Sequence, residues 1–434
     1  MGQTSRFQLI LLAFFVIFII AGVLVFSLYQ GLNSKEREQV LLWGTIPESL
    51  FRAVAETDEY KATGIKVFYV EKNADSFESE FVNALAEGRG PDLILMPHDL
   101  LQQESKKLSI IPSSVFGERE YRDLFVEGSE IFLEADGVLA IPFTADPLVM
   151  YWNRTLFQNA GISKPPTTWD EFVTLSSKLS EKDASDNVRK SIAAFGGFQN
   201  VKNAKEIVSL LIMQSGSPIV SRNVEGGLDA TLDSAQGATG VGSASEEALG
   251  FYTSFSNPTK PNHSWSRALP LSENAFVAGD LATYFGFASE LPNLRRKNPN
   301  LNFDVATMPQ PRDVKTKMTF ANFNVFAIPK QSKFSNEAYF VARTLTSAPI
   351  MAKASELSQL TPSRRDLLGL TQTDLYRQVF YKSALIARAW RDPNKEQTNL
   401  VFGRMIDGIT SGRETVSEAL SLASSQLQRL LAGE

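Results

Sequence analysis

Aromatic, acidic and imidazole side chains follow two apolar runs in the first hundred residues of the chain. Trp43 and Glu48 lie at and just beyond the end of the first run, and His98 and Asp99 follow the second. Carboxylates and imidazole form hydrogen bonds with polar ligands, and an indole ring offers an apolar face for stacking. These four residues are therefore candidates for a binding site. Three also have a structural interpretation: Trp43 as a core residue, His98 as a loop residue and Asp99 as a helix cap.

The residue counts exclude several other kinds of chemistry. The chain has no cysteine, which rules out disulfides, thiolate zinc sites and a cysteine nucleophile. Its two histidines, His98 and His263, leave little for a histidine metal cluster or a serine triad. A net charge of -5 lends no support to nucleic-acid binding. We therefore expect no cofactor and no metal.

The elements that must hold the candidate residues alternate between strand and helix. Apolar and β-branched runs predict strands at Val40–Gly44, Ile65–Val70 and Leu93–Met96, with amphipathic helices between them. This order predicts a parallel sheet covered by helices on both faces. Ligands of such sheets bind beyond the carboxyl ends of the strands, near Trp43–Glu48 and Pro97–Asp99 in this chain.

Capping signals mark two further helices. Thr168 with Glu171 forms a capping-box pattern before the predicted helix Trp169–Leu179, and Thr415 with Glu418 forms another before an amphipathic C-terminal helix. The chain has 434 residues, more than one hydrophobic core usually covers. We therefore expect two domains.

The N-terminus carries an uncharged apolar segment, Leu9–Leu28. About 20 apolar residues are enough to cross a bilayer as a helix, so residues 7–29 are predicted to be a single-pass membrane anchor. Arg6 before the segment favours an inside start and an extracytoplasmic body. A cleaved secretory signal is the alternative, although its apolar core is usually shorter.

Several segments, in order along the chain, resemble the family 1 extracellular solute-binding proteins of ABC importers, the group that includes the maltodextrin-binding proteins. The most specific is IPFTADPLVMYWNRTLFQNAGISKPPTTWDEF at Ile141–Phe172. The other matching segments are Phe77–Asp99, Ala248–Phe255, Asn274–Pro292, Asn322–Ser332, Thr361–Leu368 and Ser411–Leu420.

The resemblance implies a two-lobed α/β fold of the periplasmic-binding-protein type II class, with the ligand in a cleft between the lobes. The expected lobe boundaries are residues 38–143 plus 319–350 for the first lobe and 147–306 plus 355–434 for the second. Unlike many bacterial relatives, this chain has no lipobox cysteine and keeps a hydrophobic segment instead.

The resemblance also implies a function. The chain is expected to capture a small-molecule solute, a sugar or oligosaccharide, and to deliver it as a monomer to the permease subunits of an ABC importer. A surface sensor or adhesin with the same fold is the alternative. A cell-surface glycosidase is a less favoured alternative, because the sequence offers no way to pair the two carboxylates that such chemistry needs. The resemblance therefore implies a binding protein and not an enzyme.

Further site residues follow from the resemblance and from positions near predicted strand ends and crossovers. Asp146 occupies a position that resembles a family ligand carboxylate, and residues 284–287 resemble a family sugar-contact segment. The candidates beyond the first four are Asp146, Tyr151, Phe198, Tyr284, Phe285, Phe287, Asn322, Asn324 and Arg364. Each of the aromatic residues can equally belong to the core.

Overall fold

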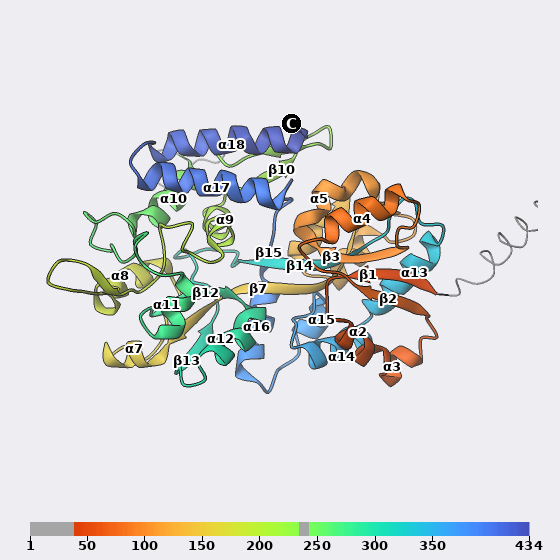
Figure 1. Ribbon diagram of the computed structural model, residues 1–434, viewed down its shortest axis with the longest axis horizontal. Helices are drawn as coiled ribbons and strands as arrows, with labels where there is room; N and C mark the ends of the chain where they lie inside the picture. Colours follow the sequence, from red (N-terminus) through yellow and green to blue (C-terminus); the bar gives the residue numbers. More distant parts are fainter. Residues whose placement is uncertain (1–38, 234–242, 434) are drawn as a thin grey trace, which may run out of the picture.

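The computed structural model describes residues 39–233 and 243–433 and shows two α/β lobes side by side (Figure 1). The lobes are joined by strands that run between them, as the two-lobed fold class requires. The predicted anchor at residues 7–29 lies outside the described residues. Among the helices of 39–233 and 243–433, none is long and apolar enough to cross a membrane.

The first lobe is built on the three predicted parallel strands. β1 (Val40–Gly44) lies between β2 (Val67–Glu71) and β3 (Leu93–Pro97), and both pairings are parallel. β14 (Thr319–Ala327) then pairs antiparallel with β3 and extends the sheet. The strand predictions in this lobe are therefore confirmed, and the carboxyl ends of β1, β2 and β3 lie at one edge.

Alternate side chains of the central strand enter two different cores. Val40 and Leu42 pack with Phe51 and Val341 on one face of the sheet, whereas Trp43 packs with Phe81 on the other. Both faces are covered, which explains why β1 is apolar throughout. The covering helices are α2 (Glu48–Ala55), α13 (Ser335–Leu345) and α14 (Ala348–Ser358) on the first face and α4 (Phe77–Ala86) on the second.

One long strand connects the lobes. β7 (Ile141–Asn153) pairs through residues 141–147 with β14, and through 148–153 with β12 (Thr283–Phe287) and β13 (Phe303–Ala306). One strand of thirteen residues is therefore shared between the two lobes. The pairing with β14 shifts register between Asn324 and Val325, where the ladder is irregular.

The second lobe surrounds the other half of β7 with helices and a large aromatic core. Trp169 contacts Phe172, Phe195 and Phe285, and its indole N–H donates to Gln214 Oε1 at 2.7 Å. Figure 1 shows the last two helices lying antiparallel along one side of this lobe. The helices used below are α8 (Trp169–Leu179), α9 (Ala204–Gln214), α10 (Ala244–Ser254), α17 (Lys395–Thr410) and α18 (Val416–Ala432).

The chain passes between the lobes again near its C-terminus. At β15 (Ala387–Arg388), Ala387 packs with first-lobe residues, whereas Trp390 packs in the second-lobe core. Leu367 and Leu368 also pack with first-lobe residues, although the sequence analysis placed residues 355–434 in the second lobe. The other lobe boundaries stay predictions.

Both predicted capping boxes are present. Thr168 accepts a hydrogen bond from the Glu171 N–H at the start of α8, and Thr415 accepts one from the Glu418 N–H at the start of α18. In each box the glutamate side chain also accepts a bond from the cap residue's N–H. These bonds satisfy backbone donors that have no partner within the helix.

Replacing Thr415→Ala should lower the free energy of unfolding by about 1 kcal/mol, because the cap bond to the Glu418 N–H is lost. Urea denaturation followed by circular dichroism measures this change. Ser417→Ala, an exposed site in the same helical turn, is the control and should leave the unfolding midpoint unchanged. Equal losses in both variants would contradict the importance of the cap.

Candidate functional site

The two lobes meet beyond the carboxyl end of β3. The first lobe contributes η1 (His98–Leu100) and α5 (Leu101–Glu104), and the second contributes the start of α17. Asp99 Oδ2 lies 2.8 Å from Lys395 Nζ, and the Asn394 side chain donates to Gln103 Oε1 at 2.8 Å. These two contacts join opposite walls of the cleft, so the lobes touch in this structure.

A buried ion pair lies inside the second lobe, and one of its members, Asp392, precedes Lys395 closely in the chain. Lys205 Nζ at the start of α9 lies 2.7 Å from Asp392 Oδ2, and each side chain is only 5% exposed. The Thr398 hydroxyl lies 2.9 Å from the Asp392 carboxylate and can donate to it, and Lys205 Nζ lies 5.9 Å from the centre of the Trp390 ring. Buried charges persist when they are paired and hydrogen-bonded, which is the case here.

Asp99 has unused hydrogen-bonding capacity. Its Oδ2 pairs with Lys395, but its Oδ1 is buried and has no hydrogen-bond partner among the residues that the structure describes. Burial alone would raise the pKa of Asp99, but the ammonium group of Lys395, which also donates a hydrogen bond, outweighs it and holds the pKa below its ordinary value. Asp99 is therefore an ionised acceptor at the contact between the lobes, and one of its oxygens has no partner among the described residues.

Glu206 stands beside this pair on the opposite lobe. Burial raises the pKa of Glu206, and the Lys205 and Lys395 ammonium groups act against that rise while Asp99 adds to it. Its carboxyl group accepts a hydrogen bond from the Glu206 backbone N–H, which also lowers the pKa, and it forms no ion pair within the described part of the chain. Asp99 and Glu206 thus bring carboxyl groups from two lobes close enough to influence each other.

His98 is held in one tautomer. Its Nδ1 accepts the Phe323 N–H at 3.2 Å, and burial lowers the pKa of the imidazole. A neutral ring that accepts at Nδ1 carries its proton on Nε2. His98 therefore links η1 to β14 and keeps one N–H donor.

A cavity of about 330 Å³ opens between the lobes next to the Asp99–Lys395 contact. Its first-lobe wall comes from α5 and the residues after it, and its second-lobe wall comes from the segment before α17 and the end of α18. The residues that line it are Gln102, Gln103, Ser105, Lys106, Pro393, Asn394 and Leu430–Gly433. Amide side chains, which can both donate and accept, are prominent on both walls.

Four of the predicted site residues lie near the point where β7 passes from one lobe to the other. The Ser289 N–H donates to Asp146 Oδ1 at 3.0 Å and so links the middle of β7 to the second lobe. Burial raises the pKa of Asp146 to about 7 against the two Ser289 hydrogen bonds that lower it. Asn322 lies opposite Asp146 in the ladder, and the Asn324 amide donates to Thr144 Oγ1 at 3.0 Å. Phe287 packs edge-on against Phe320.

Three predicted aromatic residues lie inside the second-lobe core. Tyr151 is fully buried and donates to the Phe287 carbonyl at 2.8 Å, Tyr284 donates to Glu290, and Phe285 stacks on Phe195 at 4.9 Å. No ring face of these residues opens into the cavity described above. As ligand contacts they stay predictions.

Two candidates at the end of β1 have partners within the first lobe. The Lys72 ammonium lies 3.8 Å from the centre of the Trp43 ring and covers that face, while the ring packs in the core. Glu48 is exposed at the start of α2 and accepts a hydrogen bond from Arg52. Neither residue lines the cavity beside Asp99.

The last two candidates lie apart from each other. Phe198 packs in the second-lobe core against Gly403 of α17, whose lack of a side chain makes room for the ring. Arg364 lies in the first lobe, where its guanidinium pairs with Asp366 and donates to the Thr346 carbonyl. The structure therefore places Asp99 at the contact between the lobes with the buried His98 next to it in the chain, and Asp146 opposite Asn322 in the ladder between β7 and β14.

The charged residues of the second lobe near the contact between the lobes were not predicted from the sequence. Lys205, Glu206, Asp392 and Lys395 carry no motif, and charged residues at such positions usually belong to solvated surfaces. The only local signal is the dense polar run RDPNKE after Trp390, at the start of a capped helix. The pairing of Lys205 with Asp392 joins residues 187 positions apart, which no spacing rule reveals.

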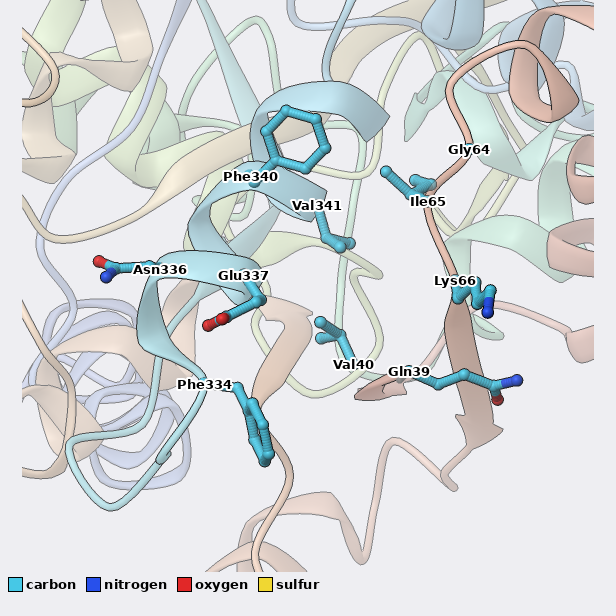
Figure 2. A pocket seen from close by; sticks show the side chains of 10 residues that line it. All are labelled: Gln39, Val40, Gly64, Ile65, Lys66, Phe334, Asn336, Glu337, Phe340 and Val341. Carbon is cyan, nitrogen blue, oxygen red and sulfur yellow. The ribbon is translucent and has the colours of Figure 1, made fainter. Parts of the chain in front are cut away.

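A second cavity, of about 380 Å³, lies at the amino ends of β1 and β2 and so at the opposite edge of the sheet from the cleft. Figure 2 shows Phe334, Val341 and Phe340 of the α13 region facing Val40 and Ile65 across it. Its walls are largely apolar and come from the first lobe alone. It does not share the two-lobed construction of the cleft.

Residues 44–351 match the family described as bacterial extracellular solute-binding protein. This chain belongs to that family. Curated relatives of the solute-binding protein are distant: a protein of Brucella abortus described as a binding protein is 23% identical over 163 residues. That alignment spans 40% of the relative's length and 37% of this chain.

The fold of this solute-binding protein is shared with solved structures. A cyclo/maltodextrin-binding protein complexed with maltotetraose has a TM-score of 0.71 at 18% identity, covering 91% of this chain and 98% of the other. The cyclic α-maltosyl-1,6-maltose binding protein of Arthrobacter globiformis has a TM-score of 0.75 at 14% identity, covering 91% and 99%. The maltose-maltodextrin binding protein of Alicyclobacillus acidocaldarius has a TM-score of 0.64 at 18% identity, covering 90% and 100%. All are described as binding proteins rather than enzymes, and they confirm the two-lobed fold.

Asp146 should make the stability of the solute-binding protein depend on pH. Because its pKa rises from an ordinary 3.8 to about 7 on folding, the folded protein retains a proton that the unfolded chain releases between these values. The contribution of Asp146 is therefore fully present below pH 4 and is lost as the pH rises through 7. In urea titrations from pH 5 to 8, Asp146→Asn should gain stability relative to the unmodified protein as pH rises. Parallel profiles would contradict the assignment.

Asp392→Ala should lower the free energy of unfolding by about 3 kcal/mol, because it leaves the Lys205 ammonium buried without a partner. Combining it with Lys205→Met should recover part of this loss, since no unpaired charge remains. The control is Asp170→Ala, which removes the exposed Arg312–Asp170 pair and should cost less than about 1 kcal/mol. Urea denaturation of all variants provides the comparison, and equal losses for Asp392 and Asp170 would contradict it.

Proposed function

We propose that the chain captures a sugar or oligosaccharide between its two lobes outside the cytoplasm and delivers it to an ABC importer. Family membership supports solute capture. The proteins that share its fold are described as binding maltotetraose, cyclic maltosyl-maltose and maltodextrins, which supports a carbohydrate ligand. The hydrophobic segment Leu9–Leu28 supports a body that is tethered to the membrane.

The observation that carries this proposal is the pair of carboxyl groups at the meeting point of the lobes. Asp99 keeps a buried oxygen without a partner among the described residues, and its charge acts on Glu206 of the other lobe, whose pKa it helps to raise. Carboxyl oxygens accept hydrogen bonds, and sugar hydroxyl groups supply donors. The amides of Gln102, Gln103 and Asn394 beside them can serve either role.

Contacts from both lobes are what a closing mechanism requires. A ligand shifts the open–closed equilibrium only through interactions that differ between the two states. A sugar that bonds Asp99 on one lobe and Glu206 on the other gains both interactions only when the lobes are together. Binding and closure are then the same event, as in hinge-closing proteins.

The same residues disfavour anionic ligands. A carboxylate or phosphate placed against Asp99 and Glu206 would meet like charge at close range. The preferred solute is therefore a neutral polyhydroxyl compound.

Calorimetric titration of the full-length protein in detergent against malto-, cello- and manno-oligosaccharides tests the proposal. We expect at least one neutral series to bind, and Asp99→Asn and Glu206→Gln each to weaken it by about tenfold, which is 1.4 kcal/mol. Glu337→Gln, a carboxylate change at the remote cavity, is the control and should leave affinity unchanged. Binding of a peptide or polyamine, with no response to any carbohydrate, would overturn the ligand class.

A further inference from the structure

A second set of contacts joins the lobes at a different point from the Asp99–Lys395 pair. In the second lobe, β10 (Val220–Arg222) and β11 (Leu228–Ala230) form a short antiparallel hairpin. The Arg222 guanidinium at the end of β10 donates to the Leu133 carbonyl at 2.9 Å and forms an ion pair with Glu134. Leu133 and Glu134 form β5 of the first lobe. The hairpin thus reaches across the gap between the lobes.

Glu134 binds a second guanidinium. Its Oε1 lies 3.0 Å from Arg391 NH1, while its Oε2 faces Arg222. Arg391 is 9% exposed and also donates to the Ile131 carbonyl at 2.9 Å and to Gln102. Arg391 is thereby bound to the first lobe, whereas the next residue, Asp392, is paired within the second.

The hairpin is a supported extension of the second lobe. The Ala230 N–H donates to Gln428 Oε1 of α18 at 2.7 Å, and the Arg222 guanidinium also donates to the Gly226 carbonyl within the turn at 3.2 Å. Because the hairpin is bonded to α18, a rotation of the second lobe away from the first would carry Arg222 away from Glu134. The ion pair is therefore compatible with the closed arrangement only.

We propose that Glu134 is a positioning residue that holds the two lobes closed through Arg222, at a point outside the ligand-contacting residues. The inference rests on the proposed hinge-closing function. Glu134 is not among the residues that line the inter-lobe cavity, so it acts on closure rather than on ligand contact. The Glu134 side chain is 17% exposed, which makes this pair less screened by salt than fully exposed ion pairs.

Two consequences follow for binding. The pair contributes to the closed state with or without a ligand, so its loss should increase the share of open molecules about two- to fivefold, the range expected for a partly exposed pair. Since a bound solute leaves only after the lobes separate, the loss should appear mainly as faster dissociation and not as slower association.

The absence of cysteine allows a direct measurement of closure. Val115→Cys in the first lobe and Leu422→Cys in the second are exposed positions for a pair of spin labels on the full-length protein in detergent. Distance distributions between the labels, without any ligand, report the open and closed populations. We expect Arg222→Gln and Glu134→Gln to shift the distribution toward longer distances. Added 1 M NaCl should shift the unmodified protein in the same direction, and by more than it shifts Arg222→Gln, in which the Asp99–Lys395 pair between the lobes is still present.

The control is Arg267→Gln, which removes the Arg267–Asp407 pair inside the second lobe and should leave the distances unchanged. The Arg222→Gln, Glu134→Gln double variant should shift by less than the sum of the two single variants, because the two side chains share one contact. Identical distributions in the unmodified protein and Arg222→Gln at both salt concentrations would overturn the inference. If the variants shift the distances but the protein binds no carbohydrate, the role of Glu134 in closure is supported and the proposed ligand class is refuted.

Discussion

The backbone ladder between β7 and β14 is the constraint on which the rest of the molecule depends. β7 bonds to β14 in one lobe and to β12 and β13 in the other, so both lobes are attached to a single hydrogen-bonded strand. Separation of the lobes therefore requires bending at this ladder, near Asp146 and the irregular step at Asn324, and in the connection between Ala387 and Trp390. The relative positions of the side chains that the two lobes present to each other therefore depend on this hinge.

The cleft is built from ionised groups whose partners come from distant parts of the chain. Lys205 and Asp392 form a buried pair within one lobe, and Asp99 and Lys395 form a pair between lobes. Removing one member of such a pair is costly, because it leaves a buried charge without a partner. The pairs therefore add little net stability, but they favour the arrangement of the two lobes in which both members meet. The acceptor capacity that remains on Asp99 and Glu206 is then available at the place where the lobes meet.

Local signals were sufficient for the parts of the fold that depend on neighbouring residues. The strands β1 to β3 and both capping boxes depend on side chains within a few positions, and the sequence predicted them. For the aromatic residues of β12, no local pattern predicted which side chains face a ligand. Tyr284, Phe285 and Phe287 are all buried, so the alternation that separates an inner from an outer face is missing there.

The sequence by itself determined the family and the strand–helix order of the first lobe. It also excluded cysteine chemistry and identified His98 and Asp99 as candidate binding residues. Tertiary structure alone decided which charges meet, since Lys205 and Asp392, or Arg222 and Glu134, are separated by many residues. Charge pairing depends on distance in space, and for residues on different lobes that distance is set by the shared strands of the hinge.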